Sequence, residues 1–251
     1  MKTYPYGARV WVGYRHAQFK QRRSRFIESL GSIFIPATVQ QMKHLNLCAY
    51  FPLILADTNF RLPDEIALVV YPSPAIYESV TRGTTAGRAY GALHGNYFNF
   101  DNADGLPASY SGFPGPWQGE LEIGKPVALI DHSVDWLLGA TTVLLGARPE
   151  GVDPALFLDS AKQLAIQLAQ SPPENTDNIL LVVDEDFLIV WEHTQTQRGA
   201  TAAVDLFESI VDRDAVRSRA RVCRVKPVFS LNDPGIDPFE GELFDIREET
   251  V

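Results

Sequence analysis

One order of secondary structure is written twice along this chain of 251 residues. Residues 141–225 predict strand, helix, strand, tight turn, strand, helix and strand. Residues 8–131 predict a looser version of the same order, with an insertion before the last strand. A duplicated β-α-β-β-α-β unit makes two antiparallel sheets able to face each other around an apolar pocket. We therefore predict an α+β fold of two tandem halves with a small-molecule site between them.

Three parts of the chain are expected. The first half covers residues 1–131 and includes a Gly- and Pro-rich segment at 97–126, and the second half covers residues 132–226. The last 25 residues, 227–251, place aromatic side chains among proline, glycine and acids. We predict that they form an extended acidic tail that wraps the domain or a neighbour.

The first half is expected to begin with a strand at residues 8–15, where apolar and mixed residues alternate. One face of this strand carries Val10, Val12 and Tyr14, and the other carries Arg9, Trp11, Gly13 and Arg15. The next elements are predicted as helices at 18–30, ended by Gly31, and 36–45, and as strands at 47–56 and 65–71.

A third helix is predicted at residues 74–91, because Ser73 supplies a hydroxyl cap and proline follows at the first helical position. It contains Gly83, Gly87 and Gly91, and an interior glycine costs about 1 kcal/mol relative to alanine. Either close packing on a sheet or backbone approach to a ligand or partner helix compensates. The aromatic-rich segment 97–126 that follows is expected to be ordered, as either a structural plug or a lid.

The second half is expected to be more regular. Asp153 and Pro154 begin a helix by the same capping logic, and an acidic turn at 184–186 joins two strands of a hairpin. Glu192 and His193 are expected in a surface loop after the second of these strands. The elements are predicted as strands at 141–147, 179–183, 187–191 and 219–225, a helix from 154 with an apolar stripe of Phe157, Ala161, Leu164, Ala165 and Leu168, and a helix at 202–211.

The net charge of −9 is unevenly divided. Residues 1–125 carry 12 Lys and Arg against 9 Asp and Glu, a balance of +3, and residues 126–251 carry 10 against 22, a balance of −12. Because the acidic half repels a phosphate backbone, we expect no nucleic-acid partner. The basic cluster at residues 20–25 is expected to be a solvated helix face, or to pair with the acidic half of a second subunit.

We expect a cytoplasmic protein without a membrane partner. No apolar run approaches the roughly 18 residues needed to span a bilayer, and residues 1–7 lack the apolar region of a signal peptide. Cys48 and Cys223 lie on predicted strands of different halves, and in that compartment two buried thiols are expected rather than a disulfide.

The predicted order resembles the dimeric α+β barrel superfamily in its single-chain, duplicated, ferredoxin-like form, over most of residues 8–225. Members include cofactor-free monooxygenases, isomerases, polyketide cyclases and, in longer duplicated forms, haem enzymes. The resemblance implies a ligand between a concave sheet and its helices, and a homodimer. By topology it implies pocket walls from Val10, Val12 and Tyr14 and from the helix at 74–91.

His94 is the leading candidate for chemistry, since it stands at a predicted helix end directly before the aromatic segment. An imidazole there either caps the helix or serves as a general base. The catalytic set that we predict is His94 as base with Tyr97 and Tyr14 as oxyanion donors. The substrate contacts that we predict are Val10, Val12, Arg15, Asn96 and Trp117.

A second candidate cluster, Asp131, His132 and Asp135, follows the strand expected to close the first half. Neighbouring residues on a strand point to opposite faces, so Asp131 does not easily orient His132, whereas Asp135 does if the chain turns. No metal is expected, because the spacing matches no metal-binding motif.

Three hypotheses about function remain open. The first is a cofactor-free isomerase, cyclase or monooxygenase, of the kind found in secondary metabolism, that removes a proton next to a carbonyl of a small apolar substrate. The second is a haem enzyme, which the predicted helices at 154–170 and 202–211 disfavour because they carry no histidine. The third is a non-catalytic small-molecule binder or assembly protein.

Overall fold

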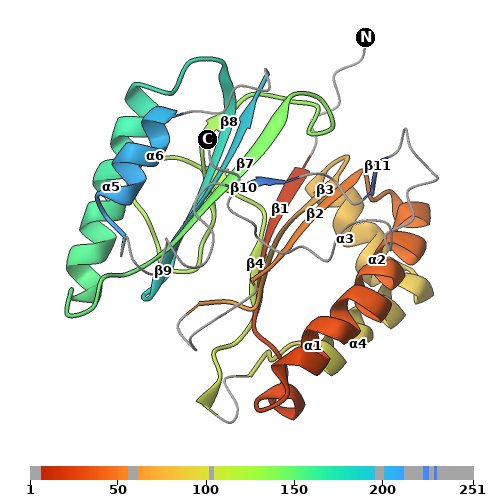
Figure 1. Cartoon of the computed structure of the whole chain (residues 1–251). Coiled ribbons are helices and arrows are strands. Elements are labelled where there is room, and N and C mark those ends of the chain that lie inside the picture. The colour runs from red at the N-terminus through yellow and green to blue at the C-terminus, as the bar shows by residue number, and fades with distance from the viewer. Residues whose placement is uncertain are drawn as a thin grey trace. The chain divides into compact units, whose positions relative to one another are not determined.

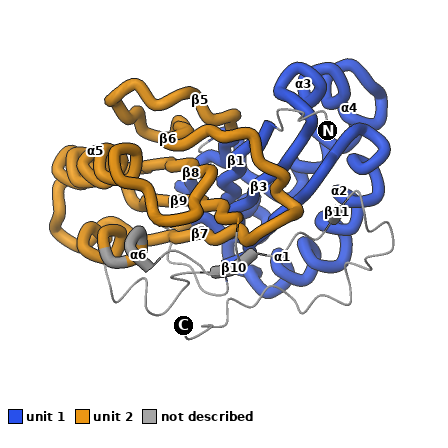
Figure 2. Tube along the Cα trace, turned by 90° about the horizontal axis from the view of Figure 1, so that it is seen from above, with its two compact units in different colours: residues 1–55, 63–111, 227–245 blue, residues 56–62, 112–226, 246–251 orange. Residues whose placement is uncertain are grey.

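The computed structural model describes residues 7–55, 62–101, 105–195, 201–211, 223–225 and 229–230. The chain divides into two compact units, coloured separately in Figure 2. The first is built mainly from residues 7–55 and 63–111, and the second mainly from residues 112–195, 201–211 and 223–225. Each unit has a sheet covered on one face by helices (Figure 1), so the predicted α+β class is confirmed.

The sheet of the first unit has the strand order β11-β2-β3-β1-β4. The central strands are antiparallel, with Gly13 of β1 opposite Glu65 of β3 and Arg9 opposite Val69. The strands are β1 (Gly7–Gly13), β2 (Ala49–Ile54), β3 (Glu65–Tyr71), β4 (Tyr110–Gly112) and β11 (Phe229–Ser230).

A nearly continuous helical segment connects β1 and β2, so the predicted helix end at Gly31 is wrong. The chain passes through α1 (Arg23–Ser29), a π-helical turn (Leu30–Phe34) and α2 (Ile35–Met42), with 3₁₀ turns at Ala17–Phe19 and Lys43–Leu45. Leu30 and Phe34 are fully buried. Burying two such side chains contributes about 1.5–3 kcal/mol each, which outweighs the roughly 1 kcal/mol cost of a helical glycine.

The predicted helix at 74–91 is two helices, α3 (Pro74–Gly83) and α4 (Thr85–Tyr97). Ser73 caps α3 as predicted, because its hydroxyl accepts a hydrogen bond from the Ile76 N–H at 3.2 Å. The break lies at Thr84, whose backbone is extended at ψ 153°. The Thr84 hydroxyl accepts from the Gly87 N–H at 2.9 Å and donates to the Val80 carbonyl at 2.6 Å, so one side chain stabilises both sides of the corner.

Gly87 is required by this corner. A Cβ at position 87 would lie 2.2 Å from the Val80 carbonyl oxygen and 2.7 Å from Thr81 backbone atoms, so α4 meets the end of α3 backbone to backbone. A Cβ at Gly83 or Gly91 would meet open space instead. Of the three glycines, only Gly87 is therefore required by close packing.

The second unit contains a sheet of order β10-β7-β9-β8-β6-β5. All its neighbouring strands are antiparallel except β5 and β6, which run parallel. The strands are β5 (Gly115–Pro116), β6 (Val127–Asp131), β7 (Ala140–Ala147), β8 (Thr176–Val183), β9 (Phe187–Thr194) and β10 (Cys223–Val225).

Two helices, α5 (Pro154–Gln170) and α6 (Thr201–Glu208), cover this sheet (Figure 1). Asp153 caps α5 by accepting a hydrogen bond from the Ala155 N–H at 2.8 Å, as predicted. The buried residues of α5 are the predicted stripe: Phe157, Ala161, Leu164, Ala165 and Leu168. No helix in the described ranges combines the length and apolar character that a membrane crossing requires.

The duplication is visible in the strand order. Numbering the four strands of each repeat along the chain, β4-β1-β3-β2 and β10-β7-β9-β8 both give the order 4-1-3-2 of a ferredoxin-like sheet. The closing strand of the first repeat is β4 rather than the predicted strand at 127–131. That strand, β6, pairs with β8 of the second unit, so the boundary lies near residue 111 instead of 131.

Two other predictions fall partly outside the described residues. Only β10 and β11 are described after residue 211, and β11 pairs with β2, so a short part of the 227–251 segment joins the first sheet. Cys48 is a buried cysteine that takes part in no disulfide, as expected. The side chain of Cys223 lies outside the described part of the structure.

Candidate functional site

The first unit encloses a cavity of about 400 Å³ between its sheet and its helices. The sheet contributes Arg9 and Trp11 of β1, Tyr50 of β2, and Glu65, Val69 and Tyr71 of β3. The helical side contributes Phe34, then Tyr77, Thr81 and Arg82 of α3, and Gly87, Arg88, Tyr90, Gly91 and His94 of α4; Phe100 and Ser111 complete the wall. A cavity of this size suits one small molecule.

A buried carboxyl lies in the sheet wall of the cavity. Glu65 accepts a hydrogen bond from Trp11 Nε1 on Oε2 at 3.1 Å and another from the Tyr50 hydroxyl on Oε1 at 2.9 Å. Neighbouring strands supply all three residues, since Trp11 is on β1 and Tyr50 on β2, on either side of β3. The two donors hold the carboxyl in place. Among the described residues, Glu65 has no cationic partner.

Gly13 makes the contact between Trp11 and Glu65 sterically possible. It pairs with Glu65 across β1 and β3, and a Cβ at position 13 would lie 2.7 Å from Trp11 Nε1 and 2.8 Å from the Phe98 ring. The absent side chain provides the space in which the indole reaches the carboxyl.

Burial sets the protonation of Glu65. Removal from water raises its pKa from 4.5 to about 7, although the hydrogen bonds from Tyr50 and Trp11 oppose the shift by favouring the ionised form. A carboxyl with a pKa near neutrality exchanges protons efficiently at physiological pH. Glu65 is therefore chemically suited to act as a general acid or base in this cavity.

His94 faces the same cavity from α4. Its Nδ1 lies 3.0 Å from the Tyr90 carbonyl oxygen. Since a carbonyl oxygen only accepts, Nδ1 carries the proton and Nε2 keeps its lone pair. Burial lowers the pKa of His94 from 6.5 to about 4, so the ring is neutral at pH 7 and presents an acceptor.

Aromatic rings fix the orientation of the His94 imidazole. Three rings meet it edge to face, at centroid distances of 4.5 Å for Tyr90, 4.9 Å for Phe34 and 5.5 Å for Trp11. Trp11 therefore contacts both candidate groups, through its ring to His94 and through Nε1 to Glu65. The two groups belong to one packed constellation.

A guanidinium enters the cavity from the other end of β1. The Arg9 carbon Cζ lies 4.4 Å from the centre of the Tyr77 ring, a cation–π contact. Burial lowers the pKa of Arg9, although nearby tyrosines and Glu78 oppose the shift. Arg82 and Arg88 lie at the exposed corner between α3 and α4, where Arg82 pairs with Glu78 at 3.0 Å.

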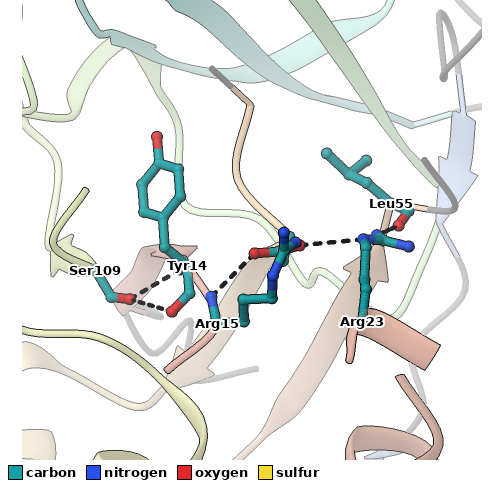
Figure 3. A network of polar contacts seen from close by, with 6 residues as sticks. Tyr14, Arg15, Arg23, Leu55 and Ser109 are labelled. Atoms are coloured by element: carbon teal, nitrogen blue, oxygen red, sulfur yellow. Dashed lines mark hydrogen bonds and ion pairs between the residues drawn. The ribbon is translucent and has the colours of Figure 1, made fainter. Parts of the chain in front are cut away.

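Of the catalytic residues predicted from sequence, His94 lines the cavity, and Tyr14 and Tyr97 do not. Tyr97 is buried and packs against Phe34, with ring centroids 5.2 Å apart. Tyr14 is buried on β1's continuation, where its backbone N–H donates to the Ser109 hydroxyl at 2.8 Å (Figure 3).

The predicted substrate contacts lie elsewhere too. Val10 and Val12 are buried, but the cavity is lined by Arg9 and Trp11, so it lies on the opposite face of β1 from the one expected. Asn96 is exposed, and its carbonyl accepts a hydrogen bond from Gln18 Nε2. The helix expected to form a wall, at 74–91, does so as α3 and α4.

Arg15 does not line the cavity and instead forms an ion pair with Asp64. Its Nη1 pairs with Asp64 Oδ1 at 2.5 Å, and its backbone N–H donates to Oδ2 at 3.0 Å. Arg23 Nε also contacts Asp64 Oδ1, at 3.2 Å, and its guanidinium donates to the Leu55 carbonyl (Figure 3). This largely buried network joins the segment after β1, α1 and the segment leading into β3.

The second candidate cluster does not assemble. Asp131 and His132 are exposed, and Asp135 accepts a hydrogen bond from the backbone N–H of Leu137 at 3.0 Å. Trp117 packs against the core of the second unit. In the described part of the chain, no three His, Cys, Asp or Glu side chains are placed to hold a metal.

The expectation of a surface loop at Glu192 and His193 is wrong, because both are buried within β9. His193 Nδ1 lies 2.6 Å from Asp177 Oδ1, and Nε2 lies 2.6 Å from the Leu138 carbonyl oxygen. Both ring nitrogens are thus engaged, so His193 offers no lone pair to iron. Neither α5 nor α6 carries a histidine, so neither helix supplies an axial imidazole to a haem.

Phe100 is the part of the predicted 97–126 segment that bears on the lid hypothesis. Phe100 lines the cavity while 49% exposed, and its ring centroid lies 6.0 Å from that of Trp11. Asn99, beside it, holds the segment by donating from Nδ2 to the Leu106 and Pro107 carbonyls, at 2.9 and 3.1 Å. The anchored backbone and the half-exposed ring are compatible with a covering role.

Sequence reasoning missed Glu65, Arg9 and Tyr50. The available signal for Glu65 is its register: it shares an apolar strand face with Ala67 and Val69, and an acid on such a face is exceptional. For Arg9, the alternation places it correctly on one face with Trp11, but the family resemblance implies the opposite face, with Val10 and Val12, as the pocket wall.

The sequence matches no protein-family model and no curated protein. The structure is similar to that of a presumed monooxygenase from Fusobacterium nucleatum subsp. nucleatum, with 12% identity, a TM-score of 0.33 and coverage of 90% of this chain and 93% of that one. A presumed monooxygenase from Lactobacillus acidophilus is 6% identical, with a TM-score of 0.34 and coverage of 89% of this chain and 93% of that one. A mutant chlorite dismutase from Candidatus Nitrospira defluvii is 9% identical, with a TM-score of 0.34 and coverage of 90% of this chain and 93% of that one. Values this low carry no evidence about the reaction.

Proposed function

We propose that this protein is a small-molecule enzyme that performs general acid–base chemistry on an apolar, carbonyl-containing substrate bound in the cavity of the first unit. The observation that carries the proposal is the joint placement of a carboxyl with a pKa of about 7 and a neutral imidazole on the wall of one largely aromatic cavity. Perturbed titratable groups facing a cavity are typical of catalytic sites. An assembly protein has no need of such a cavity.

Glu65 is the better candidate for the base, because its pKa is close to neutrality, whereas that of His94 is lowered to about 4. The Glu65 carboxylate takes the proton from the carbon next to the carbonyl. The electron pair of the broken C–H bond moves to the carbonyl oxygen and forms an enolate. In a β,γ-unsaturated ketone the electron pair is shared with the γ-carbon, and return of the proton to that carbon completes an isomerisation. His94 lines the same cavity, packs against the substrate and positions it for this proton transfer.

The test is deuterium exchange at the α-carbon of 2-tetralone, an apolar aromatic ketone, followed by NMR in D₂O. The wild-type protein should accelerate exchange over buffer, with a rate that rises as the pH passes about 7, where Glu65 ionises. Glu65→Gln should lower the rate at least 100-fold and His94→Ala at least tenfold, within the usual contribution of about 10²–10⁴ for a positioned base.

The alternatives give different results. Loss of exchange in His94→Ala with full activity in Glu65→Gln would make His94 the base. Binding of 2-tetralone in the cavity without any exchange would favour a non-catalytic binder. A Soret absorption band in the protein as purified would support the haem hypothesis and contradict chemistry without a cofactor.

A further inference from the structure

The position of Arg9 carries an inference about the substrate. Arg9 lines the cavity, and its guanidinium is stacked on Tyr77 at 4.4 Å. No carboxylate of the described residues lies within ion-pair distance of it. The cation–π contact engages the charge of the guanidinium and uses none of its N–H donors. A cation therefore faces the cavity with donors available to a ligand.

The charges of the lining add up to a site for an anion. The lining contains three arginines, Arg9, Arg82 and Arg88, and one carboxyl, Glu65. Glu78, outside the lining, pairs with Arg82 and also acts electrostatically on Arg9. The neutral His94 adds no charge. The half-buried position of Arg9 makes its charge stronger toward a ligand than the exposed arginines of the α3–α4 corner, because water screens it less.

The sheet register separates this cation from the carboxyl. Arg9 is opposite Val69, and Glu65 is four residues from Val69 along β3. At a rise of about 3.3 Å per residue, the two positions are about 13 Å apart along the sheet. A ligand that contacts both therefore has an anionic end at Arg9 and a reactive end near Glu65, where a second negative charge would be repelled.

We propose that the substrate is a carboxylate-bearing aromatic or polycyclic ketone, whose carboxylate binds the Arg9 guanidinium. The proposal rests on the proposed function, because it describes the ligand of the same cavity. A planar guanidinium presents paired N–H donors that match the two oxygens of a carboxylate. The aromatic lining of Trp11, Phe34, Tyr71 and Tyr90 fits a ring system between the two ends.

The experiment compares two probes of nearly the same shape, 2-naphthoate and the neutral 2-acetylnaphthalene, by equilibrium titration of the full-length protein. The wild type should bind 2-naphthoate at least tenfold more tightly than the ketone. Arg9→Met should remove this preference: the affinity for 2-naphthoate should fall at least tenfold, while the affinity for the ketone should stay within twofold of the wild-type value. The matched control is Arg25→Met, which removes an exposed arginine outside the cavity and should change neither affinity.

Gly91→Leu locates the bound probes, since position 91 lines the cavity and has open space for a side chain. Gly91→Leu should lower the affinity for both probes at least tenfold. Gly95→Leu, on the same helix but outside the lining, should lower neither affinity. Retained ketone binding in Arg9→Met shows that this variant is folded.

Three results overturn the inference. Equal affinity of the wild type for both probes removes the anion site while leaving the proposed function intact. An equal loss of both probes in Arg9→Met makes Arg9 a structural residue only. Failure of the wild type to bind either probe contradicts the inference and also the proposed function, because the cavity would then not accept an aromatic ligand.

Discussion

At the scale of single residues, this protein buries polar groups in two different ways. Glu65 accepts hydrogen bonds from Trp11 and Tyr50 but has no cationic partner among the described residues, so burial moves its pKa toward neutrality. Asp64, next in the chain, is paired with Arg15 and Arg23. Adjacent acids thus have opposite environments, since neighbouring residues at a strand end point to opposite sides.

Glu65 should make the protein less stable as the pH rises. Its folded-state pKa is raised to about 7 from 4.5, so its stabilising contribution is present below about 4.5 and is lost as the pH passes 7. The loss amounts to at most about 3 kcal/mol. Urea unfolding at pH 5 and pH 8 should show a larger decrease for the wild type than for Glu65→Gln. Equal decreases in the two proteins would contradict this assignment.

His193 should be important for stability alone. Replacing it with alanine leaves Asp177 and the Leu138 carbonyl without their buried partner, at a cost of about 1–3 kcal/mol in the free energy of unfolding. His132→Ala is the control, because that side chain is exposed and a substitution there should stay within about 0.5 kcal/mol. Exchange of 2-tetralone should be unaffected in both folded variants. A selective loss of exchange in His193→Ala would point to a catalytic site in the second unit.

At the scale of elements, the corner between α3 and α4 shapes the cavity. Thr84 interrupts the helix, and Gly87 allows the two helices to meet at the backbone. The corner places Arg82 and Arg88 at the cavity, and α4 then carries Tyr90, Gly91 and His94 along its wall. One straight helix over 74–97 would not place these residues together, because their spacing along its axis exceeds the width of a small-molecule site.

Gly91 and Gly95 form a natural pair for testing this wall. Both lie inside α4 with open space for a Cβ, so Gly91→Ala and Gly95→Ala should each raise the free energy of unfolding by about 0.5–1 kcal/mol. Only position 91 lines the cavity. Gly91→Ala should therefore lower the affinity for 2-acetylnaphthalene about threefold or more, and Gly95→Ala should leave it unchanged. Identical affinities in the two variants would place the ligand away from α4.

At the scale of the whole molecule, the 4-1-3-2 strand order occurs twice, and each unit has its own core. The second sheet differs from the first by gaining β6 and β5 next to β8. Leu129 of β6 and Leu121 belong to the core of the second unit. The strand at 127–131, predicted to complete the first half, thus extends the sheet of the second unit.

This boundary is testable with two fragments. Residues 112–226 contain β5 and β6, and residues 132–226 do not. The longer fragment should unfold cooperatively in urea. The shorter one should be less stable by several kcal/mol and tend to aggregate, because it loses the buried Leu129 and leaves β8 as an open sheet edge. Equal stability of the fragments, judged from their urea midpoints, would instead favour a boundary at 131.

Local patterns predicted much of the fold. The bounds of β3, the caps at Ser73 and Asp153, and the buried stripe of α5 all agree with the structure. These features depend on alternation, helical periodicity and capping, which act within a few residues. The prediction at Gly31 failed because burial of Leu30 and Phe34, a tertiary effect, outweighed the local preference of glycine.

The sequence by itself determined the duplicated order of elements and the presence of His94 at the end of a glycine-containing helix. Only the tertiary structure decided which face of β1 meets the helices, that β6 joins the second sheet, and that Glu65, Trp11, Tyr50 and His94 surround one cavity. The reason is physical. Periodicity reports that a strand has two faces, whereas the choice between them, and the pKa of an acid placed there, depend on what residues distant in sequence pack against it.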